Sequence, residues 1–221
     1  MEESRLWVVD DHAVLSGAMA DSLRSYGFQD VHVADPRDLA AESLIPVAER
    51  IRPDIVLLDL FLGDDRLGLP LIEPLTELGA AVVVLSASHD EVLLAGCVAA
   101  GAVGILDKAM RFDELVECLR RVSRGETLID EERRSHLLRE AEVSRRAEKE
   151  RMAPFRRLTA SEQQILAMLL EGRAPKQIAR ARSVSLATVR NQIRAVLEKL
   201  EVSSERQALA MAREAGWSPS E

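Results

Sequence analysis

Short apolar runs alternate with helical patterns through the first half of the chain. We predict strands at the runs Leu6–Val9, Val31–Val33, Asp54–Leu58, Ala81–Leu85 and Val103–Leu106. Apolar residues recur every three or four positions after each run, which predicts helices over 15–26, 39–51, 69–78, 90–100 and 112–123. Pro46 is expected to weaken or kink the second helix. Apolar strands that alternate with helices indicate a doubly wound α/β domain, in which a five-stranded parallel sheet is covered on both faces.

Dense charge replaces this pattern after residue 130. Residues 131–157 contain six acidic and nine basic side chains. A thin apolar stripe runs through them at Leu137, Leu138, Ala141 and Ala147. Such a stripe is too narrow for a confident coiled coil, so a solvated linker helix is favoured over a dimerisation helix. Pro154 marks the expected end of this linker.

The last part of the chain has the signals of four short helices. Thr159 and Glu162 have the spacing of a capping box, and Ser204 and Gln207 repeat it. A tight turn at 183–185 separates the second helix from the third, which predicts a helix-turn-helix module. We therefore expect three parts, namely an α/β domain at 1–128, a charged helical linker at 129–153 and an all-α domain at 154–221.

Polar side chains stand where the predicted strands end. Asp10 and Asp11 follow the first strand, Asp59 the third, Ser86 the fourth and Lys108 the fifth. The site of such a fold lies beyond the carboxyl ends of its strands, so we expect these side chains to converge there. Neighbouring carboxylates need a cation, and oxygen ligands alone favour a hard ion such as Mg²⁺. A carboxylate there can form an acyl phosphate, and a lysine can bind a phosphoryl oxygen.

Each of these residues also has an ordinary structural explanation. An aspartate after a strand often caps the next helix, a serine often lies in a turn, and a single lysine is usually solvated. The occurrence of all five at strand ends, in this order, favours a functional site over that explanation.

The same residues carry a resemblance to the receiver domain of bacterial two-component response regulators, over residues 1 to about 125. The matching segments are Val8–His12, Asp54–Asp59, Ser86–Ala87 and Lys108. The resemblance implies a flavodoxin-like fold in which Asp59 accepts a phosphoryl group from a sensor histidine kinase. It also implies that Asp11, Asp59 and the backbone carbonyl of Phe61 ligate Mg²⁺, with Asp10 assisting through water. Ser86 and Lys108 would then bind the phosphoryl oxygens.

Three positions depart from the receiver pattern. Gly63 stands where many receivers have proline, Ile105 where many have an aromatic switch residue, and Ala109 where many have proline. None of the three removes a side chain of the predicted site. Ile105 does call into question the usual switching by a serine together with an aromatic residue.

Charge divides the chain in the same place as the motifs. Residues 1–130 carry 24 acidic and 11 basic side chains, whereas residues 131–221 carry 13 acidic and 18 basic ones. A basic segment can bind nucleic acid through counterion release, or it can be an ordinary solvated surface. On charge alone the two interpretations are equally favoured.

The third helix of the last part offers a more specific signal. Val189 and Ile193 give it an inward face, which leaves Arg190, Asn191 and Arg194 together on the outward face. An arginine there can bind guanine and an asparagine can bind adenine. The basic residues available for phosphates are Lys176, Arg180, Arg182, Lys199 and Arg206. A helical bundle with a solvated basic face would show the same pattern.

Residues 158–212 resemble the LuxR-type DNA-binding domain. The matching positions are Leu158, Thr159, Glu162, Gly172, Ile178, Ala179, Ser185, Thr188, Val189, Arg190, Lys199, Leu200 and Val202. Gln192 replaces a common histidine of that family, and Ser161 a common arginine. A receiver followed by this module is the layout of NarL/FixJ-like response regulators. The resemblance implies a transcription regulator that binds promoter DNA, with Thr188 among its contacts, and that forms a homodimer when its kinase phosphorylates Asp59.

Two other functions are weighed against this one. An atypical regulator would bind DNA without phosphorylation and use the receiver as a dimerisation or partner-binding module, and Ile105 is among its few supports. An aspartate-nucleophile phosphatase usually carries a second acid two residues after the nucleophile, where this chain has Phe61, so an enzyme is not expected. The chain shows no apolar stretch that could span a membrane, no secretory signal and only two cysteines, so we expect a cytoplasmic protein.

Overall fold

The N-terminal part of the chain forms a parallel sheet in the computed structural model, which describes residues 4–63 and 66–219. Its strands are β1 (Leu6–Val9), β2 (Val31–Val33), β3 (Ile55–Asp59), β4 (Ala81–Ser86) and β5 (Gly104–Asp107). All of these strands pair in parallel, in the order β2-β1-β3-β4-β5. This sheet confirms the predicted doubly wound, flavodoxin-like fold.

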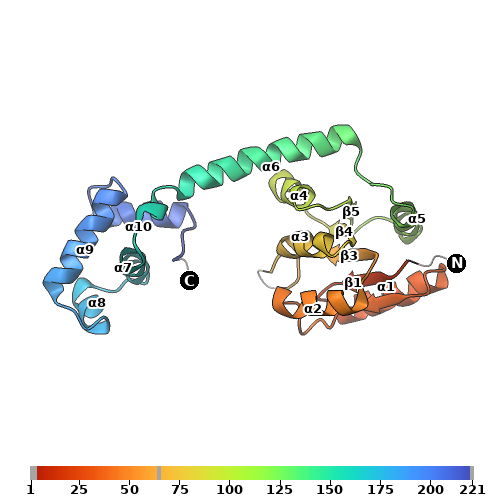
Figure 1. Cartoon of the computed structure of the whole chain (residues 1–221), viewed down its shortest axis with the longest axis horizontal. Coiled ribbons are helices and arrows are strands. Elements are labelled where there is room, and N and C mark those ends of the chain that lie inside the picture. Colours follow the sequence, from red (N-terminus) through yellow and green to blue (C-terminus); the bar gives the residue numbers. More distant parts are fainter. Residues whose placement is uncertain (1–3, 64–65, 220–221) are drawn as a thin grey trace. The chain divides into compact units, whose positions relative to one another are not determined.

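Helices cover the sheet on both faces (Figure 1). They are α1 (Ala13–Ser25), α2 (Ala41–Ile51), α3 (Leu69–Glu77), α4 (Glu91–Ala99) and α5 (Phe112–Ser123). Helices α2, α3 and α4 share one apolar cluster, and helices α1 and α5 share the other. Successive strand residues enter opposite clusters, as Val56 and Ile55 do, because side chains alternate across a strand. The strands are therefore buried on both faces, which explains their continuous apolar runs.

The order of the strands reverses at β1, which lies between β2 and β3. In doubly wound sheets the crevice beyond such a reversal is where ligands bind. The residues that follow β1 and end β3 therefore border the position that the fold favours for a site.

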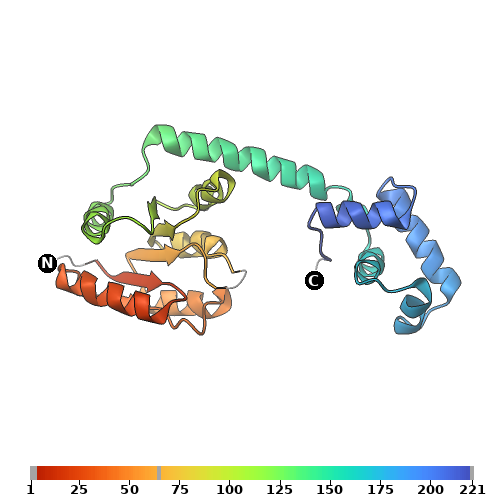
Figure 2. The same cartoon turned by 180° about the vertical axis from the view of Figure 1, so that it is seen from behind.

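A long helix, α6 (Glu131–Met152), follows the α/β domain (Figure 2). The chain divides into two compact units at residue 143, so α6 belongs to both of them. We call residues 1–143 the N-terminal unit and residues 144–221 the C-terminal unit. Leu137 is buried in the apolar cluster of α2, α3 and α4, so the first half of α6 is not the wholly solvated linker that the sequence favours.

The C-terminal unit is helical, as predicted. After a short 3-10 helix, η1 (Phe155–Arg157), it contains α7 (Ala160–Leu170), α8 (Pro175–Ala181), α9 (Leu186–Lys199) and α10 (Glu205–Glu214). Two apolar clusters hold these helices together. Phe155 stacks on Trp217 with 5.5 Å between ring centroids, which holds η1 against the segment that follows α10.

Local signals in the sequence account for the helix ends, with one correction. Thr159 and Glu162 form the predicted capping box at α7. At α10, Ser204 accepts a hydrogen bond from the Gln207 amide as predicted, but the Gln207 side chain binds Ser203 instead of closing the box on Ser204. Across the described ranges, no helix is long and apolar enough to cross a membrane.

Candidate functional site

The polar residues at the strand ends are brought to one edge of the sheet, as predicted. Asp59 ends β3 and Asp10 directly follows β1, and both are buried. Ser86 ends β4, where it is also buried, and the Lys108 amide donates to its carbonyl over 3.1 Å. The parallel register of β1, β3, β4 and β5 produces this convergence, because each residue follows or ends a paired strand.

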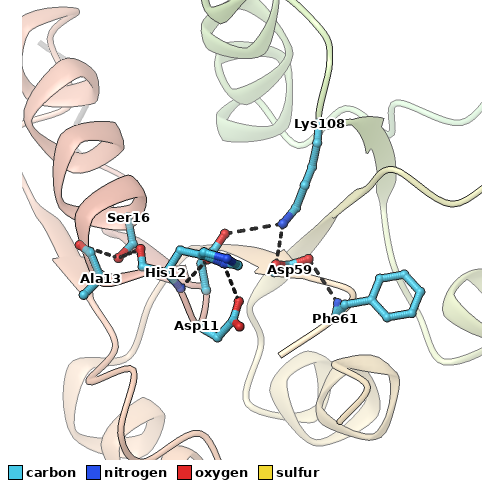
Figure 3. A network of polar contacts seen from close by, with 8 residues as sticks. Asp11, His12, Ala13, Ser16, Asp59, Phe61 and Lys108 are labelled. Atoms are coloured by element: carbon cyan, nitrogen blue, oxygen red, sulfur yellow. Dashed lines mark hydrogen bonds and ion pairs between the residues drawn. The ribbon is translucent and has the colours of Figure 1, made fainter. Parts of the chain in front are cut away.

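Lys108 bridges two of the carboxylates (Figure 3). Its ammonium binds Asp59 Oδ2 directly and lies 3.6 Å from Asp10 Oδ2. The other oxygen of Asp59 accepts a hydrogen bond of 3.0 Å from the Phe61 amide. These two bonds hold the Asp59 carboxylate in one orientation at the end of its strand.

The buried carboxylate of Asp59 is held at an energetic cost. Burial raises the pKa of Asp59, and the bonds from Lys108 and the Phe61 amide lower it only in part. A carboxylate whose charge is poorly solvated gains more than an exposed one from a nearby cation or from losing that charge in a covalent bond.

His12 joins the acidic cluster, although no site role was predicted for it. Its Nδ1 lies 2.7 Å from Asp11 Oδ1 and 3.3 Å from Asp10 Oδ1. The Asp11 carboxylate, followed by Asp10, raises the pKa of His12. Ligand atoms of Asp10, Asp11, His12 and Asp59 lie within 4.8 Å of one another. The signals in the sequence were that His12 directly follows the acidic pair and that it ends the matching segment Val8–His12.

This donor set fits a hard divalent cation. Three carboxylates lie close together and one lysine ammonium contacts two of them, so negative charge exceeds positive charge even when His12 is protonated. Carboxylate and carbonyl oxygens are the ligands that Mg²⁺ and Ca²⁺ take in proteins.

The connection after β3 folds back toward the site. Phe61 pairs with Leu67 in an isolated antiparallel bridge, and the Gly68 amide donates to the Leu60 carbonyl over 2.9 Å. A Cβ atom on Gly68 would collide with the backbone carbonyl of Asp59. The chain can therefore pass this close to Asp59 only because residue 68 has no side chain.

Helix α9 presents the predicted surface in the C-terminal unit. Val189 and Ile193 are buried, whereas Arg190, Asn191 and Arg194 are exposed on the other side. No carboxylate in the described part of the chain pairs with either of these arginines. The guanidinium groups are therefore available to an anionic partner.

Three other predicted DNA contacts differ in their surroundings. Lys176 is exposed at the start of α8. Thr188 is exposed, and its hydroxyl is bonded to the hydroxyl of Ser185, the N-cap of α9. Lys199 instead donates to Glu162 on α7 over 2.6 Å, so its ammonium already has a partner within the unit.

Ser161 is the meeting point of three helices. Its hydroxyl accepts bonds from Gln192 of α9 over 2.7 Å and from Arg182, at the end of α8, over 3.0 Å. Arg182 also donates to the Ser161 carbonyl. The two positions that depart from the LuxR-type pattern, 161 and 192, are thus direct partners. Arg182, expected to meet phosphate, is engaged inside the unit.

Comparison with known proteins gives a family for each of the two units. The chain matches the response regulator receiver domain over residues 6–120 and the luxR family of bacterial regulatory proteins over residues 156–212. It is 32% identical to the nitrate/nitrite response regulator protein NarP of Escherichia coli, over 90% of each chain. It is 30% identical to the DNA-binding transcriptional activator DevR/DosR of Mycobacterium tuberculosis, over 95% of this chain and 94% of that one. It is 25% identical to the transcriptional regulatory protein DesR of Bacillus subtilis, over 96% of this chain and 98% of that one.

The chain therefore belongs to the response regulators of bacterial two-component systems, in the NarL/FixJ-like group that joins a receiver to a LuxR-type domain. It is a DNA-binding transcriptional regulator, with promoter DNA and a sensor kinase as partners. Membership of this family also sets aside the phosphatase interpretation, because its members are regulators and not enzymes.

Proposed function

We propose that Asp59 is the residue at which this regulator is phosphorylated. The observation that supports it is the position of Asp59, a buried carboxylate bonded to Lys108 at the end of β3. One carboxylate oxygen attacks the phosphorus of a phosphohistidine on the kinase, and the bond from phosphorus to the histidine nitrogen breaks. The product is an acyl phosphate, whose oxygens Lys108 and the Ser86 hydroxyl bind.

Mg²⁺ is the proposed cofactor of this step. Asp11, Asp59 and the Phe61 carbonyl would hold the ion, with Asp10 assisting through water. The proximity of the three carboxylates supports this set, and the ion would neutralise negative charge on the phosphoryl group during transfer. Lys108 supplies a second positive charge next to Asp59.

Helix α9 is the proposed element that reads DNA sequence. Arg190, Asn191 and Arg194 would contact base edges, and Thr188 would contact the DNA at the start of the helix. Their common exposure on α9 supports this role. Lys176 would bind phosphate. For Lys199, the bond to Glu162 means that a phosphate contact would have to compete with an existing ion pair.

Phosphorylation is proposed to produce a homodimer in the cytoplasm. A two-fold dimer of this module would bind two half-sites about one helical turn of DNA apart, or a multiple of it.

Mass measurement tests the assignment of Asp59. Purified protein is incubated with Mg²⁺ and acetyl phosphate, and its intact mass is recorded beside Asp59→Asn and the exposed control Asp38→Asn. Wild type and Asp38→Asn are expected to gain one phosphoryl group and to elute earlier, as dimers. Labelling of Asp59→Asn to the same extent would refute the assignment. Uptake by wild type without a change in elution would refute the dimer.

A pair of arginine variants tests the reading helix. Arg190→Ala is expected to weaken binding to a selected operator by roughly 1–3 kcal/mol and to relax preference at one base pair. Arg213→Ala, an exposed arginine of α10, serves as the matched control and should bind as wild type does. An equal loss on all DNA sequences would instead make Arg190 a phosphate contact, against the proposal.

A further inference from the structure

The first turn of α9 presents a small apolar side chain on the face that is proposed to read DNA. Ala187 is exposed, and it precedes Arg190 by three positions and Asn191 by four. Residues at these spacings are neighbours on a helix surface, and Arg194 continues the same face beyond Asn191. The proposed reading face therefore begins with a methyl group and continues with hydrogen-bonding side chains.

The other side chains of this turn are already engaged within the C-terminal unit. The Thr188 hydroxyl is bonded to the Ser185 hydroxyl over 2.8 Å, and Ser185 also accepts a bond from the Thr188 amide. Leu186 is partly buried and Val189 is fully buried. Within this turn, Ala187 is thus the residue whose side chain is both exposed and not engaged elsewhere in the unit.

An exposed valine lies at the same end of the helix. Val184 is 40% exposed and directly precedes Ser185, the N-cap of α9. Among the described residues of the C-terminal unit, it is the only large apolar side chain that is exposed. A single exposed valine is common on protein surfaces, so Val184 alone indicates nothing. Together with Ala187, however, it makes the N-terminal end of α9 apolar.

An apolar side chain in this position matches one feature of a DNA base pair. A helix-turn-helix module places the N-terminal residues of its recognition helix against base edges in the major groove. Thymine presents its C5 methyl group there, and alanine is one of the side chains that contact this methyl group. Ala187 has no donor or acceptor for the other features of the base edges, so its chemistry fits thymine.

We propose that Ala187 is a specificity-determining residue, which selects a thymine in the operator through contact with the C5 methyl group. This inference rests on the proposed role of α9 as the helix that reads DNA. Three residues of an α-helix span about 4.5 Å, and successive base pairs are about 3.4 Å apart. The selected thymine therefore lies within about two base pairs of the one that Arg190 contacts.

The contact has a measurable size that hydrogen bonding by Arg190 and Asn191 does not share. Removing one buried methyl group from the interface should weaken binding about fourfold, because that much transfer free energy is lost. Hydrogen bonds from an arginine or an asparagine go to purine nitrogen and oxygen atoms, which are unchanged when a thymine loses its methyl group.

Uracil scanning of a selected operator tests the contact. The operator is selected with the full-length protein, and each thymine is then replaced in turn by deoxyuridine, which pairs with adenine but lacks the methyl group. Wild type should lose affinity about fourfold at one thymine position near the base pair that Arg190 contacts. In Ala187→Gly the same replacement should leave affinity unchanged, because the protein no longer has a methyl group to make the contact.

Two controls separate this coupling from a general weakening of DNA binding. Glycine also lowers the stability of α9, but that loss is the same on thymine and uracil, so the ratio of the two affinities reports the contact alone. Ala210→Gly, at an exposed alanine of α10, is the matched variant and should keep the ratio of wild type. If Ala187→Gly does not fold, Ala187→Ser replaces it and should also lose the preference, because serine can bond to more than one base.

The outcomes distinguish this inference from the proposed role of α9. A methyl effect that is equal in wild type and Ala187→Gly, or that disappears in Val184→Ala instead, would overturn the role of Ala187. The same conclusion holds if no thymine is methyl-sensitive while Arg190→Ala still relaxes the preference at one base pair. If neither Arg190→Ala nor Ala187→Gly changes any base preference, α9 is not the reading helix and both proposals fail.

Discussion

Replacement of Lys108 by methionine is the most informative test of the charge balance at the acidic site. Methionine keeps an apolar stem of similar length but removes the ammonium that lies between Asp59 and Asp10. The three carboxylates then have no fixed lysine beside them. The variant should be destabilised without a divalent cation and largely restored with one, because the cation takes over the role of the ammonium.

Two interactions limit how much folding stability the Lys108→Met variant can lose. At a separation of 3.6 Å and an effective dielectric constant of about 20, the attraction between Lys108 and Asp10 is about 5 kcal/mol. Asp59 limits the loss, because it can bind a proton instead. Protonating a carboxyl group with an ordinary pKa near 3.9 costs about 4 kcal/mol at pH 7 and about 1.5 kcal/mol at pH 5. We expect a loss of about 3 kcal/mol at pH 7.

The sign of the pH dependence follows from the same reasoning. Burial already raises the pKa of Asp59, and loss of Lys108 raises it further. The destabilisation is therefore complete above the folded pKa of Asp59 and disappears as the pH falls toward its unfolded value. The penalty at pH 5 should be no more than about 1.5 kcal/mol.

Urea unfolding can measure this loss of stability in the N-terminal unit, where Lys108 lies. The chain has two tryptophans, Trp7 in β1 and Trp217 in the C-terminal unit, so Trp217→Phe leaves a reporter for the receiver alone. The Lys108→Met variant is measured in this background with EDTA and with Mg²⁺, at both pH values, beside the exposed control Lys176→Met. A variant as stable as its parent at pH 7 in EDTA, or a penalty that grows toward pH 5, would refute the reasoning.

Two further substitutions test one contact in each unit. Gly68→Ala should destabilise the receiver by roughly 1–3 kcal/mol and slow phosphoryl uptake at Asp59, because the new methyl group meets the carbonyl of Asp59. Urea unfolding measures the loss of stability, and intact mass measures the uptake. Normal uptake would contradict this prediction. Ser161→Ala should lower the stability of the C-terminal unit by about 1–3 kcal/mol, because Gln192 and Arg182 lose a shared hydrogen-bond acceptor. Trp217 fluorescence during unfolding measures this loss. A loss of less than about 0.5 kcal/mol would contradict the prediction.

Much of the acidic site could be predicted because parallel strands impose their own geometry. Residues that end or directly follow buried parallel strands must lie at one edge of the sheet, so Asp10, Asp59 and Lys108 can be grouped from the sequence alone. The outward face of α9 was predictable for a similar reason, since the 3.6-residue period separates Val189 from Arg190 and Arg194.

The remaining features depend on contacts between distant segments, which no local pattern contains. Leu137 and Leu138 are equivalent in the sequence, and only the packing of α6 on α4 decides which of them is buried. Lys199 was expected to be free for phosphate, but Glu162, on a helix 37 positions earlier, lies within bonding distance. His12 entered the cluster because the chain turns into α1 directly after Asp11.

The bond between positions 161 and 192 has a consequence for exchanging parts between related proteins. The LuxR-type pattern that the sequence resembles has arginine at position 161, whereas here the guanidinium beside Ser161 comes from Arg182 at the end of α8. A chimera that imported α7 alone, with its arginine, would place two guanidinium groups against each other. The residues at positions 161, 182 and 192 are therefore coupled by contact, and a graft of any helix of this module should carry all three from the same parent.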